Sequence, residues 1–321
     1  APGIKPSQVK HLRIAHGIAW PYCNTYGGQR YEPDVKSVMI NWNPVQVLGD
    51  VPVEADGSAR FRVPSDVPVY FQLLDENHME LRRMRSFISF QPGEVRGCVG
   101  CHETREEAGA APTVSLAMAR EASIPVPPPW GDRPISFLRD VQPVLDKHCV
   151  ECHSGWKPKA GLDFSGGLTA RHNRAYDTIY ANRLVAWSNV GEDARVTMPM
   201  EFGSHKSKLA EVFLKRLRAK PPKITEEEWL RVVTWIDANA PYHDGFLNKR
   251  QAEMPYDLPN DRELGQKIAA VHAKRCGGCH DVAAVSRLDW IDLARPEQSR
   301  FLAAPLSKTA SGQGKCAKPV Y

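Results

Sequence analysis

Nine residues of the sequence form three copies of one pattern, in which two cysteines are separated by two residues and a histidine follows directly. The copies are Cys98-Val-Gly-Cys101-His102, Cys149-Val-Glu-Cys152-His153 and Cys276-Gly-Gly-Cys279-His280. From the frequencies of cysteine and histidine, one such pattern is expected by chance about 0.007 times in a chain of this length. Two thiols at this spacing can form thioethers with the two vinyl groups of one haem, while the adjacent imidazole binds its iron. The sequence therefore predicts three covalently bound haem c groups.

Two other uses of paired cysteines fit the sequence less well. A zinc site draws four ligands from two pairs about 15 to 20 residues apart, whereas the pairs here are separated by much longer stretches. A redox-active dithiol usually lies in a β-α-β pattern, and none flanks these pairs. Since thioether-bound haem is made outside the cytoplasm, the motifs also predict a periplasmic or equivalent extracytoplasmic lumen. Cys23 and Cys316 lie outside the motifs, and we expect a disulfide or two buried thiols.

The sixth coordination position of each iron indicates the role of the haem. A haem whose sixth position is filled by a residue transfers electrons, whereas a haem with an open position can bind small molecules. For the second haem the sequence favours His205 as distal ligand, with Met198 of Met198-Pro199-Met200 as the alternative. For the third haem, no His or Met follows His280. Three explanations stay open there: an upstream ligand such as His272 or Met254, a ligand from a missing C-terminus, or an open iron. No ligand is assigned to the first haem.

Composition sets the remaining limits. A chain of 321 residues has room for two or three compact domains. Its formal net charge of +5 is not gathered into basic runs, so no nucleic-acid partner is expected. No apolar run approaches the ~20 residues of a membrane-spanning helix. The chain begins without Met and stops at Tyr321 after a loop-like stretch, so we expect a piece of a longer exported protein.

The elements that must position the first motif are predicted to be β-strands. Short runs of alternating apolar and polar residues extend from Val35 to Phe90. Asp56-Gly57, between two apolar runs, predicts one hairpin, and Asp75-Glu76-Asn77 predicts a second. These signals indicate a β-rich, sandwich-like N-terminal domain over residues 1–111 that carries the first haem.

Helices are predicted to deliver the other two motifs. A helix with Pro143 in its first turn should run from Asp140 into Cys149. A capping box at Thr225–Glu228 should open a second helix, which packs on the first through the face formed by Trp229, Val232, Val233 and Ile236. A third helix, with Leu264, Ile268 and Val271 on one face, should lead into Cys276.

These signals predict a multidomain α+β fold in which mainly α, cytochrome c-like domains follow the β-rich domain. A proline-rich linker with a short helix at Leu116–Glu121 is expected over residues 112–130. The second haem would belong to a cytochrome c-like domain at 131–245. The third would belong to an incomplete cytochrome c-like unit at 246–321.

Several longer runs resemble one known family. The segments Val51-Pro-Val-Glu-Ala-Asp-Gly-Ser-Ala, Tyr70-Phe-Gln-Leu-Leu-Asp and Pro92-Gly-Glu-Val-Arg-Gly-Cys-Val-Gly-Cys-His-Glu are similar to the middle domain of hydrazine synthase alpha-subunit-like proteins of planctomycetes. The resemblance covers about residues 1 to 110. The run from Arg139 to Cys149 and the run Trp235-Ile-Asp-Ala-Asn-Ala-Pro241 resemble the cytochrome c domains that follow in this family.

The resemblance implies where chemistry would occur. In true hydrazine synthases the middle-domain haem is catalytic, and a tyrosine four residues beyond the motif histidine approaches the iron. Glu106 stands at that position here, and a carboxylate differs from a phenolate in basicity and ligand field. The resemblance also implies that the chain assembles with other subunits.

Three functions are therefore considered. The first is an extracytoplasmic trihaem cytochrome that transfers electrons between redox partner proteins. The second is a catalytic subunit of a hydrazine synthase-like oxidoreductase, acting on small nitrogen compounds at the first haem with Glu106 as catalytic residue. The third is a sensing module in which the β domain docks a partner and a haem binds a diatomic gas.

Overall fold

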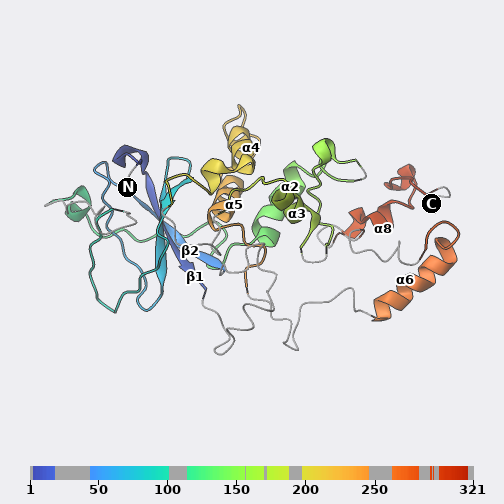
Figure 1. Ribbon diagram of the computed structural model, residues 1–321, viewed down its shortest axis with the longest axis horizontal. Helices are drawn as coiled ribbons and strands as arrows, with labels where there is room; N and C mark the ends of the chain where they lie inside the picture. The colour runs from blue at the N-terminus through green and yellow to red at the C-terminus, as the bar shows by residue number, and fades with distance from the viewer. Residues whose placement is uncertain are drawn as a thin grey trace. The chain divides into compact units, whose positions relative to one another are not determined.

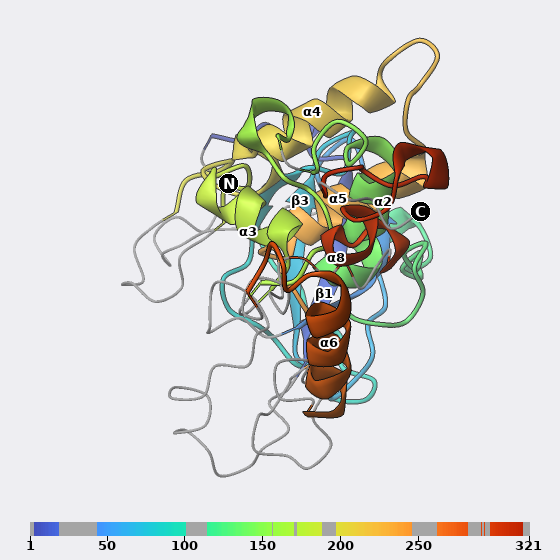
Figure 2. The same cartoon turned by 90° about the vertical axis from the view of Figure 1, so that its right-hand side faces the viewer.

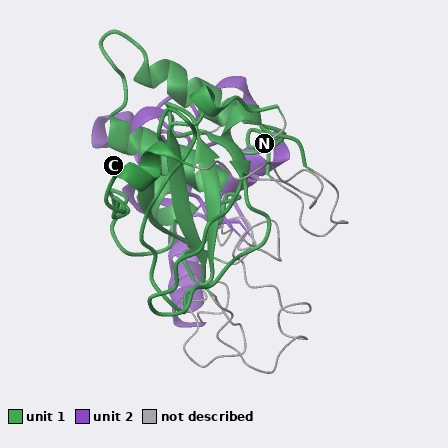
Figure 3. Ribbon diagram, turned by 90° about the vertical axis from the view of Figure 1, so that its left-hand side faces the viewer, with its two compact units in different colours: residues 1–141, 183–246 green, residues 142–182, 247–321 purple. Residues whose placement is uncertain are grey.

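A computed structural model, drawn in Figure 1 and after a quarter turn in Figure 2, provides the fold. It describes residues 3–18, 44–100, 114–155, 157–169, 172–187, 197–245, 262–281, 290, 292 and 296–316. The chain forms two compact units, coloured separately in Figure 3, and each unit combines two stretches of sequence. Unit 1 comprises residues 1–141 and 183–246, and unit 2 comprises residues 142–182 and 247–321. The predicted domain boundaries at 111, 130 and 245 stay a prediction.

Unit 1 is built on one antiparallel sheet. Its strands are β1 (His11–Gly17), β2 (Val45–Pro52), β3 (Val69–Leu74) and β4 (Glu80–Arg83), in the spatial order β2-β1-β3-β4. Strands β1 and β2 are labelled in Figure 1, and β3 is labelled in Figure 2. Along β2, alternate residues are buried, as a strand with one face on a core requires. Ile14, Val51 and Val69 form a buried cluster. The described strands make a single sheet, which differs from the predicted sandwich.

One of the two predicted hairpins is confirmed. Strands β3 and β4 pair antiparallel around the Asp75 turn, where Asp75 Oδ1 accepts the N–H groups of Asn77 and Met79 at 2.8 and 3.0 Å. The turn at Asp56-Gly57 also forms, but the hairpin predicted there is wrong. Strand β2 pairs with β1, which lies between β2 and β3, and the residues after the turn reach only an isolated bridge from Phe61 to Ser123.

The described part of the predicted linker is ordered against the sheet. A 3-10 turn, η3 (Leu116–Ala119), replaces the short helix expected there. Further on, Val126 and Asp50 exchange backbone hydrogen bonds of 3.0 and 3.2 Å. Gly49 allows this approach, because it has a φ of 148° and a Cβ at its position would lie 2.5 Å from the Val126 carbonyl oxygen. The linker therefore extends the edge of β2.

Helices complete unit 1. They are η1 (Pro6–Gln8), the π-helical η4 (Phe137–Val141), η6 (Ser204–Lys206), α4 (Lys208–Leu217) and α5 (Glu226–Asp237). The predicted capping box opens α5: the Thr225 hydroxyl accepts the Glu228 N–H, and the Glu228 carboxylate accepts the Thr225 N–H. The predicted apolar face of α5 is buried. Phe137 of η4 packs on Trp235 at 5.3 Å between ring centroids, so α5 contacts the π-helical turn that precedes α2 (Gln142–His148). The predicted packing of the Trp229 face on the helix that enters the second motif stays a prediction.

Unit 2 contains the remaining helices. They are α2 (Gln142–His148), η5 (Lys159–Gly161), α3 (Arg174–Ala181), α6 (Arg262–Arg275), η9 (Pro296–Gln298), α8 (Arg300–Ala303) and η10 (Lys308–Ala310). The buried Gln142 side chain ties α2 to α3 through Asn173 at 2.9 Å and reaches the Phe164 carbonyl at 3.1 Å. The two stretches of the unit meet where the Arg300 guanidinium contacts Gly155 O at 2.6 Å and Asp163 at 3.2 Å.

The helix before the third motif forms as predicted but buries a different residue. Helix α6 is seen along its length in Figure 2. Its predicted apolar stripe is partly or largely exposed, with Val271 48% exposed. Among the residues of α6, all of them described, His272 alone is buried. Over the described residues, we find no helix with the length and apolar character needed to cross a bilayer.

Candidate haem-attachment sites

The second motif lies where α2 ends. Because Pro143 sits in the first turn of α2, where its missing N–H costs little, the helix runs unbroken to the motif. The Cys149 N–H bonds to the carbonyl of Leu145 at 2.8 Å. The N–H groups of Cys152 and His153 then turn back onto the Cys149 carbonyl at 3.2 and 2.9 Å. This tight turn brings both thiols and the imidazole onto one short loop.

His153 contacts Phe164 through both its main chain and its ring. The Phe164 N–H donates to the His153 carbonyl at 2.7 Å, and the two rings pack at 5.1 Å between centroids with a tilt of 48°. The His153 Nδ1 atom is buried and has no hydrogen-bond partner among the described residues. A buried ring nitrogen without a partner is costly, so this imidazole suits a residue that completes its contacts by binding a ligand.

The third motif repeats the turn of the second. It follows α6, and the Cys276 N–H bonds to the carbonyl of the residue four positions earlier at 2.8 Å. The N–H groups of Cys279 and His280 turn back onto the Cys276 carbonyl at 3.0 and 2.9 Å. The His280 ring meets Trp290 edge-on, with centroids 6.4 Å apart and an angle of 88°. Two distant segments of the chain thus adopt one loop geometry.

The first motif falls in unit 1 and is only partly described. Cys98 is exposed and follows the turn at Gln91–Glu94. Cys101, His102 and the predicted catalytic residue Glu106 lie outside the described residues. The loop geometry of this motif stays a prediction.

The two candidate distal ligands for the second haem both lie in unit 1, whereas the second motif lies in unit 2. Met198 is 60% exposed, and its N–H donates to the Glu201 carboxylate at 2.9 Å. His205 lies in η6, and its Nε2 is 3.3 Å from Asp75 Oδ2. Although burial opposes the effect, the contact with His205 helps to hold the pKa of Asp75 below its usual value.

The turn that carries His205 is fixed by buried carboxylates. Asp237, at the end of α5, accepts the N–H and the hydroxyl of Ser204 at 2.7 and 3.0 Å and the N–H of Glu80 at 3.1 Å. Burial raises the pKa of Asp237 and raises that of Glu80 to about 7, although Arg83, with its Nε 2.6 Å from Glu80 Oε1, opposes the rise. This cluster joins β4 to the turn before α4.

A cavity of about 180 Å³ in unit 2 borders the second motif. Val150, between the two cysteines of the second motif, lies in its wall, and so do Arg174 and Arg300. Both guanidinium groups also contact Asp163, at 2.8 and 3.2 Å. Trp290, which touches His280 of the third motif, forms another part of the wall. The cavity therefore adjoins the second motif directly and approaches the third motif only through Trp290.

The described cysteines fit thioether formation. Cys98, Cys149, Cys152, Cys276, Cys279 and Cys316 are all free thiols. Among the described residues, no group of three His, Cys, Asp or Glu side chains lies close enough to bind a metal ion directly, as a zinc site would require. Cys316 is a partly buried free thiol, and burial, with the nearby Cys276 and Cys279, raises its pKa. Cys23 lies outside the described residues.

Motif comparison reveals residues that the sequence reasoning did not single out. Phe164 and Trp290 contact the motif histidines, and neither has a spacing signal of its own. His272 was considered only as an upstream iron ligand. Its position four residues before Cys276, where Leu145 precedes Cys149, is a signal that aligning the motifs reveals.

These features define an α+β protein whose N-terminal part is of a known type: residues 7–103 match the family described as the hydrazine synthase alpha subunit middle domain. Hydrazine synthase subunit alpha of Kuenenia stuttgartiensis is 22% identical over 264 residues, covering 60% of this chain and 32% of that protein. The solved structure of Kuenenia stuttgartiensis hydrazine synthase matches with a TM-score of 0.53 and 21% identity, over 75% of this chain and 40% of that one. The resemblance predicted from the sequence is confirmed. The chain spans about a third of the length of its curated relative.

Proposed function

We propose that this chain is a trihaem c-type cytochrome that transfers electrons outside the cytoplasm, as a subunit of a hydrazine synthase-like assembly. The observation that carries the proposal is the loop shared by the second and third motifs. In each, a helix ends at the first cysteine, and the second cysteine and the histidine fold back onto the carbonyl of that cysteine. A repeated geometry built from distant segments supports a repeated cofactor.

The residues of each loop have distinct roles in this proposal. The paired cysteines would hold the porphyrin edge, and His102, His153 and His280 would bind the irons. Haem c supplies one-electron redox chemistry when bound. The polypeptide orients the imidazoles through Phe164 and Trp290.

A second function is favoured by the family match, which ends at the first motif. In this alternative, the first haem is a reaction centre for small nitrogen compounds, and Glu106 acts beside it. The relative is named a hydrazine synthase subunit, and the catalytic role comes to this chain only as a proposal. The two functions differ in whether one iron is open to ligands.

Optical spectra with and without carbon monoxide separate the two functions. The chain, produced with a haem-attachment system, is reduced and titrated with carbon monoxide. Three low-spin haems that ignore carbon monoxide support the electron-transfer proposal. The catalytic alternative is supported if one haem binds carbon monoxide and if Glu106→Gln changes the fraction of haem that binds it. The neighbouring Glu107→Gln should leave that fraction unchanged. A chain without covalent haem contradicts both.

A further inference from the structure

His272 contacts the third motif in a way that no other side chain of α6 does. Its ring is buried, with 8% exposure, and its Nε2 lies within hydrogen-bond distance of the carbonyl oxygen of His280. A carbonyl oxygen only accepts hydrogen bonds, so Nε2 must carry the proton. The His272 carbonyl meanwhile accepts the N–H groups of Cys276 and Gly277, both at 2.8 Å. One residue thus binds both ends of the loop.

The second motif achieves the same contact by other means. There the carbonyl of His153 accepts the backbone N–H of Phe164 at 2.7 Å. The position equivalent to His272 is Leu145, which is fully buried and offers no donor. The carbonyl of the motif histidine is therefore satisfied in both loops, by the main chain in one and by an imidazole in the other.

A glycine of the third motif lies beside this imidazole. Val150, directly after the first cysteine of the second motif, is 2% exposed. Gly277 is its counterpart, and a Cβ built there would lie 3.5 Å from His272 Cε1. The ring of His272 therefore lies beside the Cα of Gly277. His272 and Gly277 thus stand in the third motif where Leu145 and Val150 stand in the second.

We propose that His272 is a positioning residue for the third haem, and that its N–H fixes the His280 carbonyl and thereby the loop that presents Cys276, Cys279 and the proximal imidazole. The inference rests on the proposed haem-binding function and deepens it. Because Nε2 is engaged by His280, the proposal gives His272 an orienting role in place of the iron ligation left open by the sequence. Groups that orient a metal ligand are commonly worth about 10- to 100-fold in metal binding or activity.

Three variants of the full chain test this role. His272→Leu introduces the residue of the second motif and removes the donor. His272→Gln keeps an N–H donor, and Lys274→Gln changes an exposed residue of the same helix. Each variant is produced with a haem-attachment system, and intact mass gives the haem count. Electron paramagnetic resonance and redox titration report the ligand field and the potential of the third haem.

The proposal expects the ratio of three-haem to two-haem chains to fall about tenfold or more in His272→Leu, with an altered resonance signal in the chains that retain the third haem. His272→Gln should restore the count and the signal, and Lys274→Gln should match the parent. If His272→Leu does not accumulate, His272→Phe replaces it with the same expectation. Unchanged counts, signals and potentials in the donor-lacking variant would overturn the role of His272. A parent chain without haem on Cys276 and Cys279 would instead overturn the trihaem function.

Discussion

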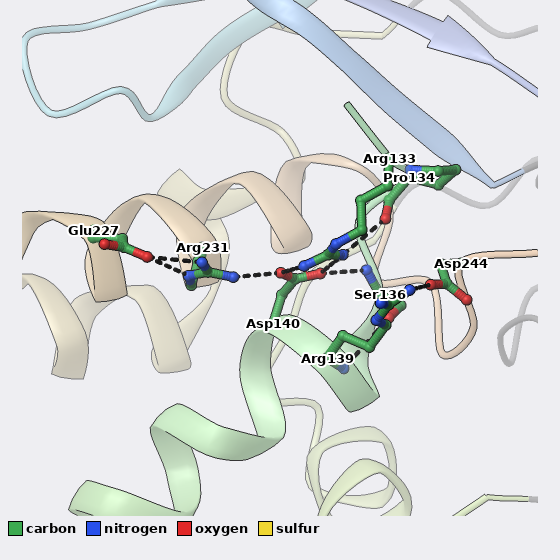
Figure 4. A network of polar contacts seen from close by, with 8 residues as sticks. All are labelled: Arg133, Pro134, Ser136, Arg139, Asp140, Glu227, Arg231 and Asp244. Atoms are coloured by element: carbon green, nitrogen blue, oxygen red, sulfur yellow. Dashed lines mark hydrogen bonds and ion pairs between the residues drawn. The ribbon is translucent and has the colours of Figure 1, made fainter. Parts of the chain in front are cut away.

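Replacing Asp140 with asparagine should destabilise unit 1 strongly. Asp140 is fully buried and accepts four hydrogen bonds (Figure 4). Arg133 donates two of them at 2.8 and 2.7 Å, Arg231 donates one at 2.7 Å, and the Ser136 N–H donates one at 2.9 Å. The asparagine side chain has no charge, and its NH₂ group would face a guanidinium donor. Two arginines would then share a buried site without their carboxylate.

The magnitude follows from the burial of the three charges. Removing one partner of a buried ion pair costs about 3 to 5 kcal/mol. Arg133 and Arg231 are 23% and 20% exposed, so water offsets part of the loss. We therefore take the lower end, about 3 kcal/mol. For a unit of this size, each kcal/mol shifts the melting temperature by about 2 to 4 °C, which gives a loss on the order of 10 °C.

A surface pair in the same network supplies the control. Asp244 accepts from Arg139 at 2.7 Å, with side chains 31% and 61% exposed (Figure 4). Such pairs contribute about 0 to 1 kcal/mol, so Asp244→Asn should melt within a few degrees of the parent. Thermal unfolding is followed by tryptophan fluorescence, because Trp235 of α5 is fully buried. Equal melting temperatures for Asp140→Asn and Asp244→Asn would refute the reasoning.

Two more predictions concern unit 1. Burial raises the pKa of Glu80 from 4.5 to about 7, so over this range the folded state holds a proton that the unfolded state has released. The free energy of unfolding should therefore fall as the pH rises from about 4.5 to about 7. Glu80→Gln should show a smaller decline in urea titrations, because Asp237, whose pKa burial also raises, remains. A parallel decline in both proteins would exclude Glu80 as its source. Gly49→Ala should cost about 1 to 3 kcal/mol and speed amide exchange at Val126, because the new Cβ meets the Val126 carbonyl. Gly93→Ala, also at positive φ but with no neighbour within 4 Å, controls for backbone strain, and equal exchange rates at Val126 in the two variants would contradict the clash.

The sequence predicted local turns and helix caps better than it predicted which strands pair with each other. The capping box at Thr225 and the turn at Asp75 depend on neighbouring residues, and both form as predicted. Strand β1 was missed because His11, Arg13 and His16 break its apolar pattern. Their polar groups find distant partners, such as Asp50 for Arg13 at 3.1 Å. One edge of β2 pairs with β1 and the other forms a bridge from Asp50 to Val126, so the residues after the Asp56 turn do not pair with β2.

The candidate site could be predicted only where the covalent chemistry dictates the spacing. The cysteine and histidine positions follow from the motif itself. The residues that support each loop do not: Phe164 acts through its backbone N–H, which any residue has, and Trp290 lies in a different segment from its partner His280. His205 illustrates the same limit, because its contact with Asp75 depends on a turn held by Asp237 of α5.

The central claim is that three haems are attached at the three motifs, and intact mass under denaturing conditions tests it most directly. The account predicts the polypeptide mass plus three haem groups. It also predicts the loss of one haem in each of the double variants Cys98→Ser/Cys101→Ser, Cys149→Ser/Cys152→Ser and Cys276→Ser/Cys279→Ser. Cys316→Ser, which removes a free thiol outside the motifs, should keep all three. A bare polypeptide mass, or a haem count that does not follow the motif cysteines, would contradict the account.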